Sequence, residues 1–226
     1  MRLSHPTTEI LLFAALAVQA PTATRAELDP TFGDGGVVST ALPGDAFAYG
    51  VVVDGDGNVV AAGFTRNGAP PTPTPAAAPV TNEDFVLVRY HADGSLDDDF
   101  GNRGVVVASL TDGNDRGFAL LAQPDGKLVE AGASCHPDCG FALARFNHDG
   151  SRDDTFGDGG QAITRVSDRN AAANALALQA DGKIILAGNS GVAQKFAVWR
   201  FNTNGALDAT FNGTGKFVTD FGSGFS

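Results

Sequence analysis

The chain is poor in methionine, tryptophan, cysteine and basic residues. Its 226 residues include one Met, one Trp and two Cys, against 29 Gly and 16 Phe. This composition disfavours long helices and is rich in the turn residues that separate short strands. Lys and Arg number 15 and Asp and Glu 26, a net charge of −11. Without a basic cluster, such a chain repels phosphates and anionic membrane surfaces. We therefore predict an all-β protein that does not bind nucleic acid.

The first 26 residues differ from the rest of the chain. Arg2 precedes the apolar run Ile10 to Val18, and small residues follow up to Ala26. This order is typical of a secretory signal peptide. Nine apolar residues are too few for a membrane span, which needs roughly 20, and no later segment is longer. The alternative, a buried amino-terminal helix, has no helical partner downstream. We predict a signal peptide over 1–26 and a secreted or cell-surface protein, with the periplasm as an alternative.

A six-residue motif recurs through the chain. Leu28-Asp29-Pro30-Thr31-Phe32-Gly33 is repeated from Leu96, Arg152 and Leu207, at intervals of 68, 56 and 55 residues. The first interval is longer because of an insert at 67–79 that contains five prolines. Proline-rich sequence of this kind favours an extended, solvated loop. Without the insert, the period is about 55 residues.

Each period contains four apolar runs separated by turn residues. In the third copy the runs are Ala175 to Gln179, Lys183 to Gly188, Phe196 to Phe201 and Lys216 to Asp220. Asp-Gly lies between the first two runs in every copy and is a strong hairpin signal, which we interpret as a tight two-residue turn. Four short antiparallel strands make one blade of a β-propeller. We predict units at about 44–111, 112–166 and 167–222, with Gly35 to Leu42 as an extra amino-terminal strand in a partial or open propeller.

The third strand of each unit is apolar on both faces. Phe85 and Leu87 alternate with Val86 and Val88, so this strand must be covered on both sides, as stacked blades would do. The second strands end in Ala-Gly, where small residues allow close approach of backbones.

These motifs together resemble the delta-60 repeat family of bacterial exported and surface proteins. The matching pattern is DGK followed by apolar residues and AG, then FALARFN-x-DG, then LD-x-TFG-x-GG, and it extends from Leu28 to Gly222. The resemblance implies a β-propeller. It implies no settled activity and no catalytic residues.

One arginine and one aspartate recur once in every unit. Arg89, Arg145 and Arg200 occupy one position of the third strand, and Asp97, Asp153 and Asp208 occupy one position of the motif, as Asp29 does in its first copy. Recurrence in all copies favours structural ion pairs within or between units. The alternative is a ring of arginines that faces a central channel and binds an anion.

Two cysteines, Cys135 and Cys139, lie four residues apart between the second and third strands of the second unit. In an oxidising compartment they are expected to form a disulfide, which would stabilise the fold little because the loop is short. A zinc site with His136 lacks an obvious fourth ligand. A free dithiol is the remaining alternative.

Several turns are rich in acidic residues and make calcium a candidate cofactor. They are Asp54 to Asn58, Asp97 to Asp99 and Asp153 to Asp158. None fits the twelve-residue EF-hand loop, and turn geometry already accounts for Asp-Gly. We therefore predict no cofactor and no metal site, and calcium stays the candidate to test.

Sequence motifs for catalysis are absent. No Gly-x-Ser-x-Gly elbow, phosphate-binding loop or His-Glu-x-x-His motif occurs, and His91, His136 and His148 are all expected in turns or loops. We predict a non-enzymatic module that serves as a surface scaffold or binds a protein or glycan through its loops. The alternative is a propeller-based carbohydrate lyase or hydrolase. Because three units cannot complete a ring, self-association through the unfinished faces is also expected.

Overall fold

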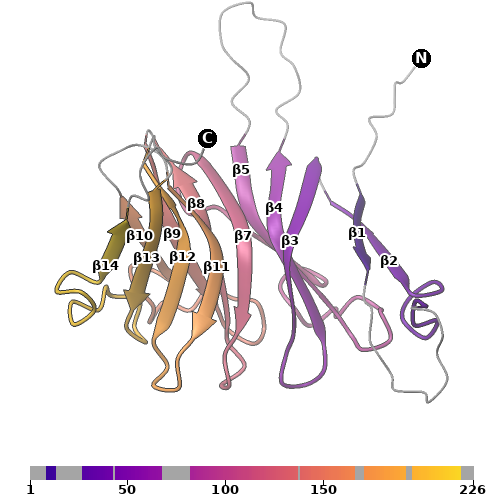
Figure 1. The fold of residues 1–226 in the computed structure, drawn as a ribbon. Helices are drawn as coiled ribbons and strands as arrows, with labels where there is room; N and C mark the ends of the chain where they lie inside the picture. Colours follow the sequence, from indigo (N-terminus) through magenta and orange to yellow (C-terminus); the bar gives the residue numbers. More distant parts are fainter. Residues whose placement is uncertain are drawn as a thin grey trace, which may run out of the picture.

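The computed structural model describes residues 9–13, 27–42, 44–67, 82–136, 138–165, 171–191 and 195–219. These residues form fourteen strands and no helix, as expected for an all-β protein (Figure 1). Accordingly, no described segment is a helix that could cross a membrane. The predicted signal peptide lies outside the described residues except for 9–13, and the proline-rich insert lies outside them except for Asn67.

Twelve of the strands form three antiparallel sheets of four strands each, in which neighbours in sequence are neighbours in the sheet. This meander is the arrangement of propeller blades and confirms the predicted fold class. The first sheet contains β3 (Asp45–Val53), β4 (Val59–Asn67), β5 (Asn82–Tyr90) and β6 (Val105–Ala108). The second contains β7 (Asn114–Ala122), β8 (Leu128–Cys135), β9 (Cys139–Phe146) and β10 (Gln161–Arg165). The third contains β11 (Ala171–Leu178), β12 (Ile184–Ser190), β13 (Lys195–Phe201) and β14 (Lys216–Thr219).

The extra amino-terminal strand is β2 (Val37–Ala41), and it belongs to none of these three sheets. It pairs antiparallel with β1 (Glu9–Phe13), which lies within the segment predicted to be the signal peptide. The strand expected to stand alone therefore has a partner along one edge in this structure.

The hairpins between the first two strands of each sheet differ from the two-residue turns expected. In the second unit Gly126 N–H donates to Gln123 O, and Gln123 N–H donates to Lys127 O. This pair of bonds closes a three-residue loop. Gly126 has a φ of 82°, while Asp125 before it does not have a positive φ. The loop is thus a type I turn followed by a left-handed glycine, which adds a bulge.

Each first strand carries a bulge opposite the Ala-Gly pair of its second strand. The register shifts between Gly117 and Ala119 in β7, and a Cβ placed on Gly132 would collide with the backbone oxygen of Arg116. The close approach expected at Ala-Gly is therefore between a glycine and the bulged strand of its own sheet. The same contact recurs at Gly63 and Gly188.

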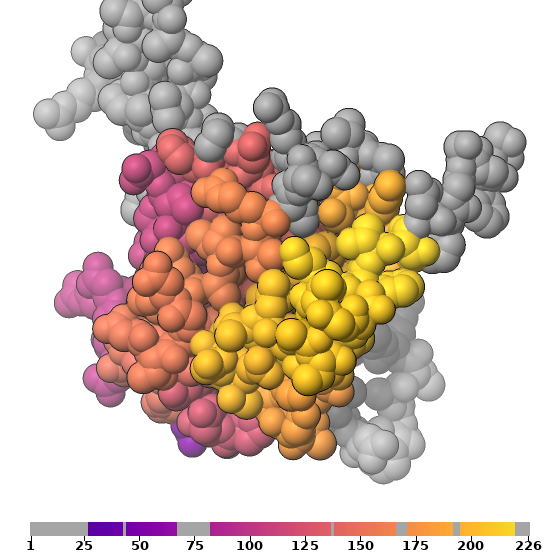
Figure 2. Space-filling view, turned by 90° about the vertical axis from the view of Figure 1, so that its left-hand side faces the viewer, coloured from indigo at the N-terminus to yellow at the C-terminus, as the bar shows by residue number. Residues whose placement is uncertain are grey.

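The core lies between successive sheets. Strand β5 is buried on both faces, because β2 and the first motif cover one side and the second sheet covers the other. Between the second and third sheets, the rings of Phe141 and Trp199 are 4.0 Å apart. Neighbouring sheets thus pack face to face. Their first strands, β3, β7 and β11, lie side by side (Figure 1). The third sheet ends the series, with β14 as its edge strand, and Figure 2 shows β14 and the preceding turn, in yellow, at the surface of the molecule.

Candidate functional site

The recurrent arginine of each unit lies against the aspartate eight residues later. The distance from Nε to Oδ2 is 2.6 Å for Arg89 and Asp97, and 2.7 Å for both Arg145 with Asp153 and Arg200 with Asp208. Each guanidinium also lies over the phenylalanine of the same motif, at 4.4 to 4.9 Å from the ring centre. The geometry combines a charge-assisted hydrogen bond with a cation–π contact.

Two of these arginines, Arg89 and Arg145, also bond to the following unit. Arg145 Nη1 donates to the carbonyl of Thr203 at 2.6 Å, and Arg89 Nη1 donates in the same way to the carbonyl of His148. The side chains of Arg89 and Arg145 are only 4% and 8% exposed. They are therefore used to hold successive sheets together and do not form an open ring of anion-binding groups.

A lysine that the sequence did not single out completes this cluster in two units. Lys127 Nζ is 2.7 Å from Asp153 Oδ2, and Lys183 Nζ is 3.0 Å from Asp208 Oδ2. Burial by itself would raise the pKa of Asp153, but hydrogen bonds from Lys127 and Thr155 and the charge of Arg145 hold it well below its usual range. The carboxylate is thus ionised and fully used by its neighbours.

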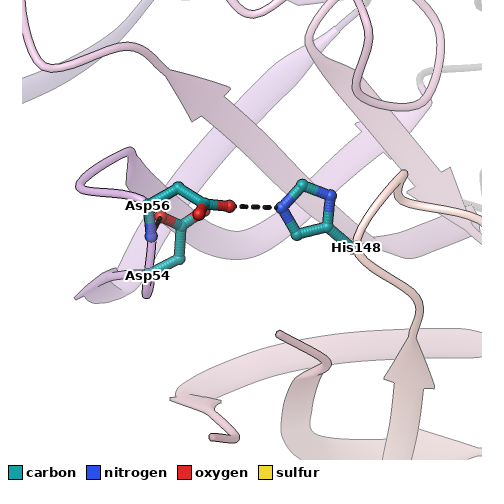
Figure 3. Close-up of side chains that lie close together, drawn as sticks. All are labelled: Asp54, Asp56 and His148. Atoms are coloured by element: carbon teal, nitrogen blue, oxygen red, sulfur yellow. Dashed lines mark hydrogen bonds and ion pairs between the residues drawn. The ribbon is translucent and has the colours of Figure 1, made fainter. Parts of the chain in front are cut away.

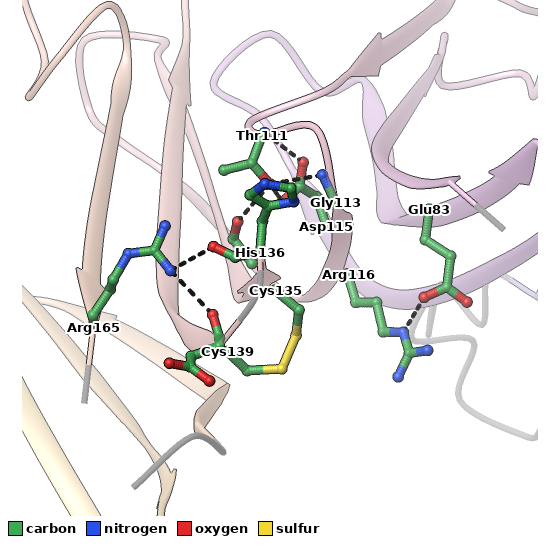
Figure 4. The surroundings of a disulfide bond; sticks show 11 residues. Glu83, Thr111, Gly113, Asp115, Arg116, Cys135, His136, Cys139 and Arg165 are labelled. Carbon is green, nitrogen blue, oxygen red and sulfur yellow. Dashed lines mark hydrogen bonds and ion pairs between the residues drawn. A yellow bond between two sulfur atoms is a disulfide. The ribbon is translucent and has the colours of Figure 1, made fainter. Parts of the chain in front are cut away.

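Cys135 and Cys139 form a disulfide, which closes the turn between β8 and β9 (Figure 4). Arg165, on β10, donates to the backbone oxygens of His136 and Asp138 at 2.8 and 3.2 Å. Because the two sulfurs are bonded to each other, this structure offers no thiolates at this position to bind zinc.

In two of the acidic turns considered for calcium, the recurrent position of the repeat motif is an aspartate whose carboxylate already bonds to other groups of the same unit. Asp97 Oδ1 accepts the N–H of Asp99, and Asp153 Oδ1 accepts both the N–H and the hydroxyl of Thr155, while the second oxygens face Arg89 and Arg145. These carboxylates do not converge on a common point. In the turn from Asp54 to Asn58, by contrast, the carboxylate of Asp56 faces His148 of the next unit.

Four aromatic side chains from within β3, β4 and β7, in the first two sheets, lie close together, and we call this group the aromatic patch: Phe47, Tyr49, Phe64 and Phe118. Tyr49 stacks on Phe64 at 5.8 Å and contacts Phe118 edge to face at 5.3 Å. Phe47 also stacks on Phe64, with the ring centres 5.0 Å apart. Phe64 is 5% exposed, whereas Tyr49 is 57% and Phe47 37% exposed. The exposed rings of Tyr49 and Phe47 therefore pack on the buried ring of Phe64.

Two arginines frame this patch and share one buried carboxylate. Arg66 lies over the ring of Phe47 and Arg116 over that of Phe64, at 5.5 and 5.8 Å from the ring centres. Glu83, whose side chain is 1% exposed, accepts from both arginines, and its Oε1 is 2.8 Å from Arg66 Nη2. Burial opposes ionisation of Glu83, but the two arginines outweigh it and lower its pKa. Figure 4 shows Arg116 directed toward Glu83.

A cavity of about 610 Å³ opens between the second and third sheets, beside the hairpin turns. It is lined by Gln123, Gln179, Arg145 and Thr203, among others. The side-chain oxygens of Gln123 and Gln179 are buried and have no hydrogen-bond partner among the described residues. The cavity could accept a small ligand that donates hydrogen bonds, although Arg145 is already engaged.

Comparison with known proteins supports the same architecture. Residues 79–100, 123–156 and 179–211 match a family described as "Domain of unknown function (DUF5122) beta-propeller". No curated protein matches the chain. The three matches recur once per sheet, and each ends at or near the phenylalanine of the motif. With three consecutive four-stranded meanders and three matches in register with them, the chain is a β-propeller repeat protein.

Proposed function

We propose that the protein is an exported, non-enzymatic binding module and that its aromatic patch binds a glycan. The observation that carries this proposal is the exposed ring of Tyr49, held in place by Phe64 and Phe118. A fixed aromatic face stacks on the apolar face of a sugar ring at little entropic cost, because its own motion is already restricted.

The groups around the patch supply the polar part of such a site. Arg66 and Arg116 carry donors over the rings of Phe47 and Phe64, and Glu83 fixes both guanidinium groups. Their position suits hydrogen bonds to sugar hydroxyls. The chain as a whole is acidic, and after residue 26 it holds 13 basic and 25 acidic residues, since Arg2, Arg25 and Glu9 precede that point. This net charge of −12 favours a neutral glycan over an acidic polysaccharide.

Export is supported by the amino-terminal sequence and by the disulfide between Cys135 and Cys139. Disulfides persist in oxidising compartments, which are also where extracellular glycans are met. Secretion can be measured by fractionating cells that express the full chain and by sequencing the amino terminus of the secreted product. Retention of the whole chain in the cytoplasm would contradict this part of the proposal.

The binding proposal is tested on a glycan array, followed by titration of the best neutral oligosaccharide. Tyr49→Ala should weaken binding at least about tenfold, the usual effect of removing an aromatic residue from the centre of an interface. Val53→Ala is the matched control, because Val53 lies on the same strand and is 54% exposed. Equal losses in the two variants, or no glycan bound by the native chain, would reject the patch as a binding site.

The competing hypothesis of a carbohydrate-active enzyme is tested with the same ligand. Incubation with the corresponding polysaccharide should release no new reducing ends and no unsaturated products. Release of either, lost on mutation of a carboxylate near the patch, would replace the binding proposal by a hydrolase or lyase.

A further inference from the structure

The hairpin between β3 and β4 departs from the other two units at two positions where those two units have the same residue. Asp54 stands where the second and third units have Gln123 and Gln179, and Asn58 stands where they have Lys127 and Lys183. Both changes make the first turn more negative. The departures are confined to the turn, since Arg89 and Asp97 of the same unit follow the common pattern.

These changes leave an uncompensated negative charge in the first unit. Its three carboxylates, Asp54, Asp56 and Asp97, face one guanidinium, that of Arg89, which gives a formal charge of −2. At the equivalent positions the second and third units each have two carboxylates, one arginine and one lysine, and the formal charge is zero. The first turn is therefore the one of the three whose electrostatics favour a divalent cation.

A histidine from the next unit completes the group. His148 lies in the turn that follows β9, where the third unit has Thr203. Its backbone oxygen accepts from Arg89, which fixes this turn against the first sheet. The histidine is thus brought to Asp54 and Asp56 by the same bond that joins the two units.

The three side chains converge as metal ligands do. One ligand atom each from Asp54, Asp56 and His148 lies within 4.8 Å of the others, and no other group of three or more such residues occurs in the described part of the chain. Figure 3 shows the imidazole of His148 facing Asp56, with Asp54 beside it. His148 Nε2 is 2.7 Å from Asp56 Oδ2.

Each ligand is suited to its role. The side chain of Asp54 is 5% exposed. Its Oδ1 accepts the backbone N–H groups of Asp56 and Asn58 at 3.0 and 2.9 Å, and its Oδ2 accepts from the side-chain amide of Asn58 at 3.1 Å, which orients the carboxylate. Asp56 and His148 are 66% and 54% exposed and can move apart. In a tetrahedral zinc site with bonds of about 2.1 Å, neighbouring ligand atoms are about 3.4 Å apart. To reach this distance, His148 Nε2 and Asp56 Oδ2, now 2.7 Å apart, would separate by less than about 1 Å.

We propose that Asp54, Asp56 and His148 bind a divalent transition-metal ion, with Zn²⁺ as the representative, and that the ion joins the first unit to the second. Neutral imidazole and carboxylate form a mixed nitrogen and oxygen ligand set, which suits zinc better than calcium. Water completes the coordination. Arg89 Nη1 is 3.9 Å from Asp54 Oδ2, but its charge is neutralised by Asp97 at 2.6 Å.

The test is calorimetric titration of the untagged full chain with ZnCl₂, together with the visible spectrum of Co²⁺ added in its place. We expect one ion per chain, absorption bands that indicate nitrogen and oxygen ligands, and a higher melting temperature with Zn²⁺ than without it. Affinity should fall in acid, because imidazole must be neutral to bind the ion.

Two variants place residues of the other units into the first site. His148→Thr and Asp54→Gln should each weaken Zn²⁺ binding at least about tenfold, because one ligand of three is lost. Asp125→Asn, in the equivalent turn of the second unit, is the matched control and should bind as the native chain does. Melting curves without metal show whether each variant is folded.

Three outcomes would overturn the proposal. The first is no binding of Zn²⁺ at millimolar concentration by the native chain, which would leave the contact of Asp56 with His148 as a simple hydrogen bond. The second is equal affinity in the native chain and in His148→Thr. The third is tight binding of Ca²⁺ that does not depend on His148, which would indicate a carboxylate site of another kind.

Discussion

At the scale of single residues, Glu130 is an acidic group in an unfavourable place. It lies on β8, is completely buried, and makes no hydrogen bond through its carboxyl oxygens within the described residues. Its carboxyl group occupies the space left by the missing side chain of Gly117. The third unit has Leu186 and Ala173 at these two positions. Burial raises the pKa of Glu130 well above its usual value.

We predict that Glu130→Leu stabilises the protein by about 2 kcal/mol at neutral pH, because a buried polar group without partners is replaced by an apolar one. Because the pKa of Glu130 is raised in the folded state, the protonated carboxyl group makes its full contribution to stability below the pKa of the unfolded chain, near 4.5. The protein loses this contribution as the pH rises through the folded-state pKa. The gain in the variant should therefore be larger at pH 8 than at pH 4. Urea unfolding at both values measures it.

Two further variants control for packing. Gly117→Ala alone should destabilise, because its Cβ would collide with the carboxyl group of Glu130. In the Glu130→Leu background only part of that loss should disappear, because the same Cβ would also lie 2.5 Å from the backbone oxygen of Gly63. A gain from Glu130→Leu that is the same at both pH values would show that ionisation is not its cause.

The recurrent arginines give a second prediction at this scale, because their surroundings differ between units. Arg145 bonds to Asp153 and to Thr203 of the next unit, whereas Arg200 bonds to Asp208 and Thr210 and to no following unit within the described residues. Arg145→Ala should cost about 2 to 3 kcal/mol of unfolding free energy, since it removes one of the two cations bonded to Asp153 and the bond to Thr203, while Lys127 stays bonded to the carboxylate. Arg200→Ala should cost less than half as much.

Chemical denaturation of the two variants measures this difference. Similar losses would indicate that the bond between units contributes little and that the pair within a unit accounts for the effect. Retention of a cooperative transition in both variants is needed for the comparison, and circular dichroism of the folded baselines checks it.

At the scale of elements, the strands could be predicted because each has its own local pattern. The apolar runs and the glycines of the hairpins define the three four-stranded meanders within a few residues. The loop length between β7 and β8 could not be predicted, because Pro124-Asp125-Gly126 suits either a two-residue or a three-residue turn by composition. The bulges in β3, β7 and β11 were also missed, since they depend on contact with a glycine about fifteen residues away.

The disulfide between Cys135 and Cys139 is an element-scale feature with a limited expected effect. It closes one turn, which is separately held by Arg165. In the chain-entropy account a loop this short contributes at most about 2 kcal/mol. We predict that changing both cysteines to serine lowers the unfolding free energy by less than this amount and leaves the fold unchanged.

Thermal melting with and without reductant, in the native chain and in the double serine variant, tests this prediction. The reduced native chain and the variant should melt together. Loss of cooperative unfolding on reduction would mean that the turn between β8 and β9 contributes to the core more than its contacts indicate.

At the scale of the whole molecule, recurrence between units decided what the sequence could predict. The arginines and aspartates repeat in every unit and were recognised as partners before their geometry was known. The aromatic patch gave no such signal, because Tyr49 corresponds to Phe118 and Asn174 in the other units. The group of Asp54, Asp56 and His148 likewise breaks the repeat and joins two units. In this fold, recurrent residues hold the units together, and the candidate binding sites lie where the units differ.

The two ends of the series of sheets have exposed apolar side chains. On β3, Val51 and Val53 are 58% and 54% exposed, and on the third sheet Phe196 and Phe217, which share one face, are 46% and 45% exposed. In the middle of the molecule the corresponding faces are covered by a neighbouring sheet. Exposed apolar surface at both ends of a stack of similar sheets favours association of the end of one copy with that of another.

The last prediction is that residues 27–226 self-associate in solution at micromolar concentration. Val51→Lys and Phe217→Lys, one at each end, should each shift the population toward monomer, because burying a lysine in the contact is unfavourable. Pro124→Lys is the control, since it adds the same charge to an exposed turn of the middle unit. Light scattering and sedimentation measure the masses. A native chain that is monomeric and melts sharply at high temperature would show that three units form a complete folding unit, and that the exposed ends need no partner.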